Sequence, residues 1–271
     1  MRLPPSDQGY LPWLPDRIDP LTQSSRPHRL ESRPFNGRVV SKSSVKEASI
    51  VTHEELFTSG AYVRDFQPET RANPFANIYA KKRDAVIRSV DGADQRVLDL
   101  GGGMGRMSVP LSRHHFVTLT DISPQMLELA RQHASDRLRL QVADARTLPF
   151  EDGAFDYVLC IDLLPHIPEP QQLLREAHRV LRSGGTLVID STNARPWWTL
   201  AYPRYMGSRP TRWVQIWQAG GVLPEWRTRV RHHRRDQFVA YLNEARFQVR
   251  SIRGFGPRAC PKWHLAVAVK A

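Results

Sequence analysis

The chain is poor in cysteine. Cys160 and Cys260 are the only cysteines among its 271 residues, and they lie far apart in the sequence. Two distant cysteines supply neither the closely spaced set of a disulfide framework nor the paired spacing of a zinc site. We therefore expect no disulfide and no bound metal.

Long apolar runs are also missing. No apolar run approaches the roughly eighteen residues that a membrane-spanning helix requires. Near the amino terminus, Pro4, Pro5, Pro12 and Pro15 interrupt the segment in which a secretory signal would carry its apolar core. We expect a cytoplasmic protein without a transmembrane segment.

Acidic residues are outnumbered by basic ones. The chain has 27 Asp and Glu residues against 39 Lys and Arg residues, which gives a formal net charge of +12. Such a charge attracts nucleic acid, anionic membrane surfaces and acidic small molecules. Because the arginines are spread along the whole chain, we interpret the charge as a feature of composition, and a nucleic-acid partner remains the alternative.

The first sixty residues lack the apolar periodicity of helices and strands. Residues 1–60 are rich in Pro, Ser and Arg, a composition typical of an irregular and partly disordered arm. Residues 61–271 are numerous enough to bury a complete hydrophobic core. We predict an arm followed by one domain.

A glycine-rich stretch organises that domain. Residues 97–100 form a short β-prone run, and the sequence Gly-Gly-Gly-Met-Gly-Arg follows it directly, which predicts a strand, a tight turn and a helix. Glycines there let the backbone turn sharply and leave N–H groups accessible to a ligand. A dinucleotide fingerprint requires its third glycine where this chain has Arg106, whereas Gly101, Gly103 and Gly105 fit G-x-G-x-G. This spacing resembles the first motif of class I S-adenosylmethionine-dependent methyltransferases.

Further segments follow in the order and spacing of that family. The run 116–120 ends in Asp121, a position from which an acid can accept both hydroxyls of a ribose. Residues 147–156 resemble the L-P-F-x-D-x-x-F-D signature of the small-molecule branch, which includes ubiquinone and menaquinone methyltransferases. The remaining matching segments are the strand-like runs 138–143 and 155–160, the loop 161–167, and the Gly-Gly turn and strand at 182–189.

The resemblance implies an α/β fold. The family has a Rossmann-like three-layer sandwich around a seven-stranded, mostly parallel sheet whose last strand is antiparallel. Asn73-Pro74 and Ser123-Pro124 each place an N-cap residue before a proline, which is typical of helix starts. From apolar periodicity we further predict helices over 106–114, 171–182 and 236–246, and strands over 247–255 and 264–269.

The same resemblance implies S-adenosylmethionine as the cofactor. Asp144 and Ala145 occupy the positions that bind the adenine amino edge, and Ile122 would pack on the adenine ring. Tyr79 lies on the helix that begins at Asn73 and resembles a lid over the cofactor; this tyrosine would contact the cofactor carboxylate or the substrate, although a core aromatic has the same spacing. The predicted cofactor-binding residues are Tyr79, Asp99, Gly101, Gly102, Gly103, Gly105, Asp121, Ile122, Asp144, Ala145 and Ile161, with Asp99 bracing the glycine loop.

The loop after the fourth predicted strand carries the catalytic candidates. Methyl transfer is an in-line displacement at an activated carbon, so the protein mainly has to align the acceptor and exclude water. His166 is the candidate base for an acceptor that holds a proton, because an imidazole accepts a proton near neutrality. Relatives also use this histidine merely to close the loop. Asp162 is predicted to orient the methionyl amine or the substrate.

An insertion rich in tryptophan and arginine follows the fifth predicted strand, at residues 193–234. Ligands of such sheets lie beyond the carboxyl ends of the strands, so we predict that the insertion caps the site. Indole and guanidinium groups suit a planar or anionic acceptor, and the alternative is that the tryptophans form the cap's own core. The predicted acceptor-binding residues are Trp197, Trp198, Arg212, Trp213 and Trp217.

The same insertion also resembles a single-strand nucleic-acid site, in which aromatics alternate with arginines. Two features disfavour that interpretation. Residues 162–165 read Asp-Leu-Leu-Pro and not the N/D-P-P-aromatic motif of amino-directed nucleic-acid methyltransferases, and neither cysteine follows a proline, as base-carbon methylation requires. We predict methyl transfer to oxygen, nitrogen or carbon of a small organic acceptor, with an RNA or protein methyltransferase as the alternative and an inactive cofactor-binding protein as the third possibility.

Overall fold

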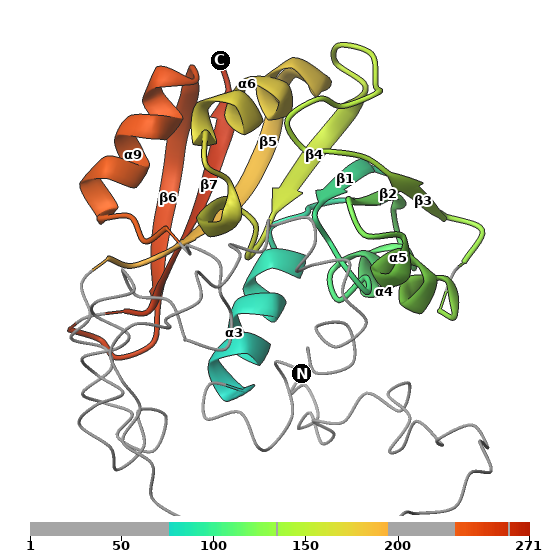
Figure 1. Ribbon diagram of the computed structural model, residues 1–271, viewed down its shortest axis with the longest axis horizontal. Coiled ribbons are helices and arrows are strands. Elements are labelled where there is room, and N and C mark those ends of the chain that lie inside the picture. Colours follow the sequence, from blue (N-terminus) through green and yellow to red (C-terminus); the bar gives the residue numbers. More distant parts are fainter. Residues whose placement is uncertain (1–75, 134, 195–230, 260) are drawn as a thin grey trace, which may run out of the picture. The chain divides into compact units, whose positions relative to one another are not determined.

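Seven strands form a mixed sheet at the centre of the described part of the chain (Figure 1). The computed structural model describes residues 76–133, 135–194, 231–259 and 261–271, all within the unit Ser49–Ala271. The predicted arm, residues 1–60, lies outside the described residues. The strands are β1 Arg96–Leu100, β2 Phe116–Asp121, β3 Leu138–Val142, β4 Phe155–Cys160, β5 Leu181–Thr192, β6 Phe247–Phe255 and β7 Trp263–Lys270.

The strand order positions a ligand crevice. Across the sheet the strands run β3-β2-β1-β4-β5-β7-β6. β1 pairs in parallel with β2 and β4, while β7 pairs antiparallel with β5 and β6. This confirms the predicted sheet with its antiparallel last strand. The chain order reverses at β1, so the carboxyl ends of β1, β2 and β4 meet at the type of switch point where open α/β sheets bind ligands.

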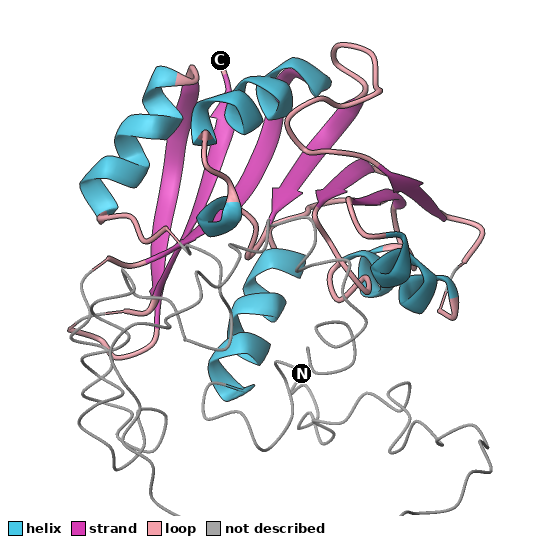
Figure 2. Ribbon diagram, in the orientation of Figure 1, coloured by secondary structure: helices cyan, strands magenta, loops and turns pink. Residues whose placement is uncertain are grey.

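Helices cover both faces of the sheet (Figure 2). One core joins α6 and α9 to the strands and includes Leu98 and Phe238. A second core lies on the other face, where α3, α4 and α5 contribute Val86, Leu111 and Leu127. The helices are α3 Ala76–Ile87, α4 Ser108–Leu111, α5 Pro124–Arg131, α6 Pro170–Val180 and α9 Arg235–Glu244, together with the 3-10 turn η1 Leu164–His166.

The sequence pattern explains the position of α6. Leu173, Leu174, Ala177 and Val180 recur at helical spacing, and all four are fully buried. Pro170 stands in the first turn, where its missing N–H costs no hydrogen bond. The predicted helix is confirmed, although it ends slightly early because the chain passes directly into β5.

The predicted helix over 106–114 is wrong in length. Only Ser108–Leu111 is α-helical. The N–H of Gly105 donates to the carbonyl of Gly102 in a turn before the helix. Pro110 lacks the N–H that would donate one turn back. The glycine loop is therefore followed by a single helical turn.

α3 lies beyond the carboxyl ends of β1 and β4, where the lid helix is predicted (Figure 1). Lys82 and Val86 on this helix are fully buried, and Tyr79 is half-buried. The predicted helix start at Asn73 lies outside the described residues. α3 thus packs on the protein through Lys82 and Val86.

The structure describes the predicted cap only at its two ends. Asn193 pairs with His233 in an isolated bridge, so the start and the end of the segment 193–234 lie side by side. None of the helices within the described ranges combines the length and apolar character needed to cross a membrane.

Candidate functional site

The glycine loop after β1 presents an open face. Gly101, Gly103 and Gly105 have positive φ angles of 61°, 57° and 82°, which favour glycine. A Cβ on Gly101 would lie 2.8 Å from Leu163 Cδ1, so the loop packs directly against the segment that follows β4. A Cβ on Gly103 would meet no atom within 4 Å. The space beside Gly103 is therefore available to a ligand.

Asp99 supports this loop from within the protein. Its carboxylate is buried, and Oδ2 accepts a hydrogen bond from Ser108 Oγ at 2.6 Å. Burial raises the pKa of Asp99 to about 6, although the hydrogen bond from Ser108 opposes the shift. A Cβ on Gly102 would lie 2.5 Å from Asp99 Oδ2. Asp99 thus lies against Gly102 of the loop and is hydrogen-bonded to the first residue of α4.

Asp121 stands at the end of β2 beside the open face. Its Oδ2 accepts a hydrogen bond from the N–H of Gly103 at 3.0 Å, and its Oδ1 accepts one from the N–H of Ser123 at 2.9 Å. Burial raises the pKa of Asp121, while these backbone donors lower it. Because the residue is only half-buried, the oriented carboxylate can still receive hydroxyl donors.

Asp144 forms an ion pair that the sequence did not predict. Arg146 donates from Nε to Oδ1 at 3.0 Å and from Nη2 to Oδ2 at 2.6 Å. The hydrogen bonds from Arg146 lower the pKa of Asp144. Ala145 is buried, and Ile122 is half-buried at the end of β2. A group that binds Asp144 must therefore share a carboxylate with Arg146.

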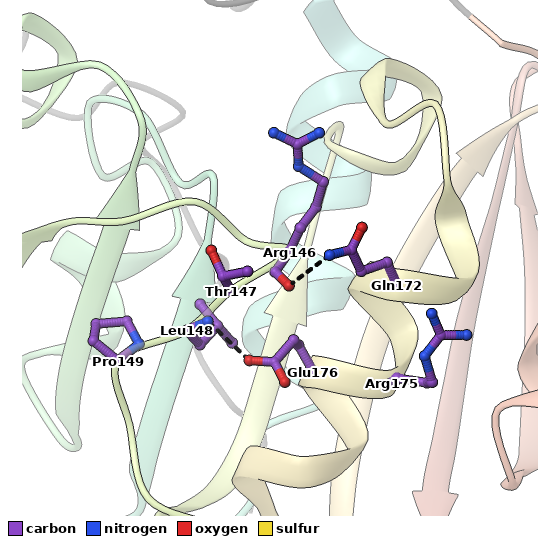
Figure 3. A pocket seen from close by; sticks show the side chains of 7 residues that line it. All are labelled: Arg146, Thr147, Leu148, Pro149, Gln172, Arg175 and Glu176. Atoms are coloured by element: carbon purple, nitrogen blue, oxygen red, sulfur yellow. Dashed lines mark hydrogen bonds between the residues drawn. The ribbon is translucent and has the colours of Figure 1, made fainter.

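An open groove lies next to this pair, between α6 and the loop that follows β3. Figure 3 shows Arg146 and Arg175 on its rim, with Gln172 donating to the carbonyl of Arg146 and Glu176 accepting from the N–H of Leu148. The lining residues are Arg146, Thr147, Leu148, Pro149, Gln172, Arg175 and Glu176.

Asp162 follows β4 with a φ of 57°, an uncommon conformation for a residue with a side chain. Its N–H donates to Asp190 Oδ1 at 2.7 Å. Its Oδ1 lies 2.5 Å from Lys82 Nζ, and its Oδ2 lies 3.5 Å from Arg106 Nη2. Burial alone would raise the pKa of Asp162, but the charges of Lys82 and Arg106 outweigh it and lower the pKa.

Lys82 joins two carboxylates. Its Nζ also lies 2.5 Å from Asp190 Oδ2, and both side chains are buried. Burial raises the pKa of Asp190, and the charge of Lys82 offsets part of that effect. The sequence places Lys82 on the apolar face of α3 but does not indicate that its ammonium is buried there beside two carboxylates. A charged residue at an otherwise apolar position, Lys82 in α3 and Asp190 in β5, was the signal that could have identified the pair.

Aromatic rings and cations surround this ion cluster. The ring of Tyr79 packs edge-on against Trp263, with the centroids 4.8 Å apart. Lys82 Nζ lies 4.8 Å and Lys262 Nζ 4.1 Å from the centroid of Trp263, within the range of cation–π attraction. Arg106 lies 5.9 Å from the centroid of Tyr79. Burial lowers the pKa of Lys262 to about 7. Tyr79 therefore belongs to a mixed aromatic and ionic cluster.

Of the remaining predicted site residues, the structure describes Ile161 and His166. Ile161 is buried in the core between the sheet and α3, and His166 is half-buried in η1, directly after the Asp162 loop. Within the described ranges, no group of three or more His, Cys, Asp or Glu side chains could hold a metal. Outside the described residues lie Trp197, Trp198, Arg212, Trp213 and Trp217.

Comparison with known families gives a direct match for this region. Residues 98–189 match the family described as "Methyltransferase domain". The matched segment runs from β1 through β5, so it contains the glycine loop, Asp121, Asp144 and Asp162.

Two named relatives match part of this chain. "Methyltransferase GfsG" of Streptomyces halstedii is 31% identical over 142 residues, which are 49% of this chain and 51% of that protein. "Ubiquinone biosynthesis O-methyltransferase" of Xanthomonas oryzae pv. oryzae is 35% identical over 118 residues, which are 42% of this chain and 49% of that protein. The chain thus spans about half the length of the curated relatives it matches.

Solved structures share the fold. Magnesium protoporphyrin IX methyltransferase from Synechocystis, solved with bound SAH, has a TM-score of 0.54 at 19% identity, covering 73% of this chain and 85% of that chain. The [4+2]-cyclase SpnF has a TM-score of 0.53 at 20% identity, covering 70% of this chain and 80% of that chain.

Residues 98–189 thus resemble a methyltransferase domain, and S-adenosylmethionine is the methyl donor that this resemblance implies. The residues at the sheet edge fit that molecule. S-Adenosylmethionine offers ribose hydroxyls and an ammonium group, and Asp121 and Asp162 offer partly exposed carboxylates after neighbouring strands of the sheet.

Proposed function

We propose that this chain transfers a methyl group from S-adenosylmethionine to a small organic acceptor. The observation that carries the proposal is the convergence of Gly103, Asp121 and Asp162 at the carboxyl ends of neighbouring parallel strands. The match of residues 98–189 to a methyltransferase domain supports it.

The carboxylates have separate roles in holding the cofactor. Each oxygen of Asp121 already accepts one backbone N–H and keeps lone pairs for the two ribose hydroxyls. Asp144, held by Arg146, accepts from the adenine amino group. Asp162 accepts from the methionyl ammonium, because its side chain is 22% exposed and ionised.

The acceptor lies on the cap side of the loop after β4. S-Adenosylmethionine supplies a methyl group that its sulfonium already activates, so the protein mainly aligns the acceptor and excludes water. His166 takes the proton of a hydroxyl acceptor, and α3 closes the site over the strand ends (Figure 1). Arg212, Trp213 and the other cap residues predicted from the sequence bind the acceptor.

An oxygen acceptor is favoured. One of the named relatives is a ubiquinone biosynthesis O-methyltransferase, which is 35% identical over 118 residues. A hydroxyl acceptor must also lose a proton, and His166 can accept it as a general base; an acceptor without a proton needs no base.

Two other functions remain to be tested. The net charge of +12 favours RNA or an acidic protein as the acceptor. The fold also occurs in a [4+2]-cyclase, so a protein of this fold need not transfer methyl groups.

Methyl-labelled S-adenosylmethionine distinguishes these possibilities. The chain is incubated with separate pools of phenols, carboxylic acids, amines, RNA and protein, and the label in each pool is counted. We expect label in a small-molecule pool, and RNA binding that weakens steeply as salt is raised. Label found only in RNA or protein would replace the proposed acceptor. No transfer to any pool by a chain that binds S-adenosylhomocysteine (SAH) would contradict the transferase assignment.

A further inference from the structure

We propose that Lys82 is a positioning residue, which connects α3 to Asp162 and thereby sets the geometry of the cofactor site. The inference rests on the proposed function, because Asp162 is assigned there to the cofactor. Lys82 acts on the ligand only through that carboxylate.

Burial separates the three members of the cluster by role. The side chains of Lys82 and Asp190 are each 1% exposed, whereas that of Asp162 is 22% exposed. A ligand can therefore reach Asp162 but neither of its partners. Lys82 and Asp190 hold Asp162 in place from the interior, and Asp162 is the residue that a ligand can contact.

Asp162 needs such a support. Its φ of 57° lies in the left-handed region, which disfavours residues with a Cβ. The hydrogen bond from its N–H to Asp190 fixes the backbone, and the ion pair with Lys82 fixes the carboxylate. Leu163, the next residue, fills the space beside Gly101, so a shift of Asp162 would also disturb the glycine loop.

Lys82 brings a third element into this arrangement. Asp162 follows β4 and Asp190 lies in β5, whereas Lys82 comes from α3, which lies beyond the strand ends (Figure 1). Its ammonium is the only group of the three that carries positive charge, and it lies 2.5 Å from both carboxylates. A buried carboxylate pair without a shared cation is strongly disfavoured. The lysine therefore both balances the pair and joins the helix to it.

A double substitution separates these two effects. Lys82→Met removes the link and leaves Asp162 and the buried Asp190 without their shared cation, so this variant alone could lose affinity simply by unfolding. Lys82→Met combined with Asp190→Asn restores the charge count. The amide introduced at position 190 can still accept from the N–H of Asp162 and can donate to its carboxylate. The ion pair that joins α3 to the carboxylates is then missing, together with the contact of the Lys82 ammonium with Trp263.

The measurement is calorimetric titration with SAH together with thermal unfolding, for wild type, both variants and Lys81→Met. Lys81 is exposed on the same helix, so this control makes the same chemical change outside the cluster. We expect Lys81→Met to match wild type. We expect the double variant to unfold close to the wild-type temperature while its Kd for SAH rises on the order of tenfold.

Three results would count against the proposal, and they differ from one another. A double variant that binds SAH as wild type does would show that Lys82 only balances charge, and would overturn its positioning role. Equal loss of affinity in Lys81→Met would also overturn that role, since any change on α3 would then suffice. A wild-type chain that does not bind SAH at all would overturn the proposed function itself.

Discussion

The Oδ2 atom of Asp121 accepts a hydrogen bond from the backbone N–H of Gly103 at 3.0 Å. This bond joins the end of β2 to the glycine loop after β1. The bond therefore fixes the position of the Asp121 carboxylate, the proposed ribose ligand, relative to the glycine loop. A ligand that contacts both meets groups whose orientation was set by folding and not by binding.

Asp121→Ala should weaken SAH binding. The variant removes the acceptor for both ribose hydroxyls, and hydrogen bonds to charged groups contribute ~1.5–3 kcal/mol, so Kd should rise by about tenfold or more. Calorimetry measures the change. Asp136→Ala, at an exposed position before β3, is the control and should bind as wild type does. Unchanged affinity in a folded Asp121→Ala protein would remove this residue from the cofactor site.

Asp99→Asn should change the pH dependence of stability. The folded pKa of Asp99 is about 6 and the ordinary value is 3.8. The folded wild type therefore binds more protons than the unfolded chain between these values, and its free energy of unfolding falls as the pH rises through them. An amide does not titrate, so the variant should gain about 3 kcal/mol relative to wild type between about pH 4 and pH 7. Urea unfolding at several pH values measures this gain. A constant difference between the two proteins would contradict the burial-raised pKa.

Arg146→Ala should weaken SAH binding only through Asp144. Without the bidentate ion pair the carboxylate loses its fixed orientation, and Kd should rise by about fivefold, or roughly 1 kcal/mol. In an Asp144→Ala background the same change should have no further effect. Arg175→Ala, on the rim of the same groove, is the matched control (Figure 3). Additive effects of Arg146→Ala and Asp144→Ala would show that the two residues act independently.

Trp213→Ala tests the cap. If Trp213 lines the acceptor pocket, SAH affinity and melting temperature should stay close to wild type, while kcat/KM for the acceptor falls by on the order of tenfold or more. If the tryptophan belongs to a core of the cap, the substitution should cost ~3–5 kcal/mol of stability. A destabilised variant with normal turnover per folded molecule would exclude Trp213 from the pocket.

The features that sequence patterns predicted are local ones. Ser123 and Pro124 start α5 as expected, with Ser123 Oγ accepting from the N–H of Met126 at 3.3 Å. The strands, the glycine loop and the apolar stripe of α6 are also local features. Each follows from the types of residue within one short segment of the sequence. The antiparallel last strand followed from the family resemblance.

The features that the sequence did not reveal are contacts between distant residues. Lys82 lies 108 positions from Asp190, and no local pattern pairs them. Arg146 lies close to Asp144, but a two-residue separation is equally compatible with side chains that point apart. The shortness of α4 depends on how Gly105 and Pro110 limit hydrogen bonding within one particular turn. Such details follow from packing, which a single sequence encodes only indirectly.

A crystal structure of the chain with SAH tests the central claim most directly. We expect the ribose hydroxyls to donate to the two carboxylate oxygens of Asp121 and the methionyl ammonium to donate to Asp162. The backbone of Gly103 should lie against the ligand. A ligand bound with its ribose hydroxyls away from Asp121 would contradict the account.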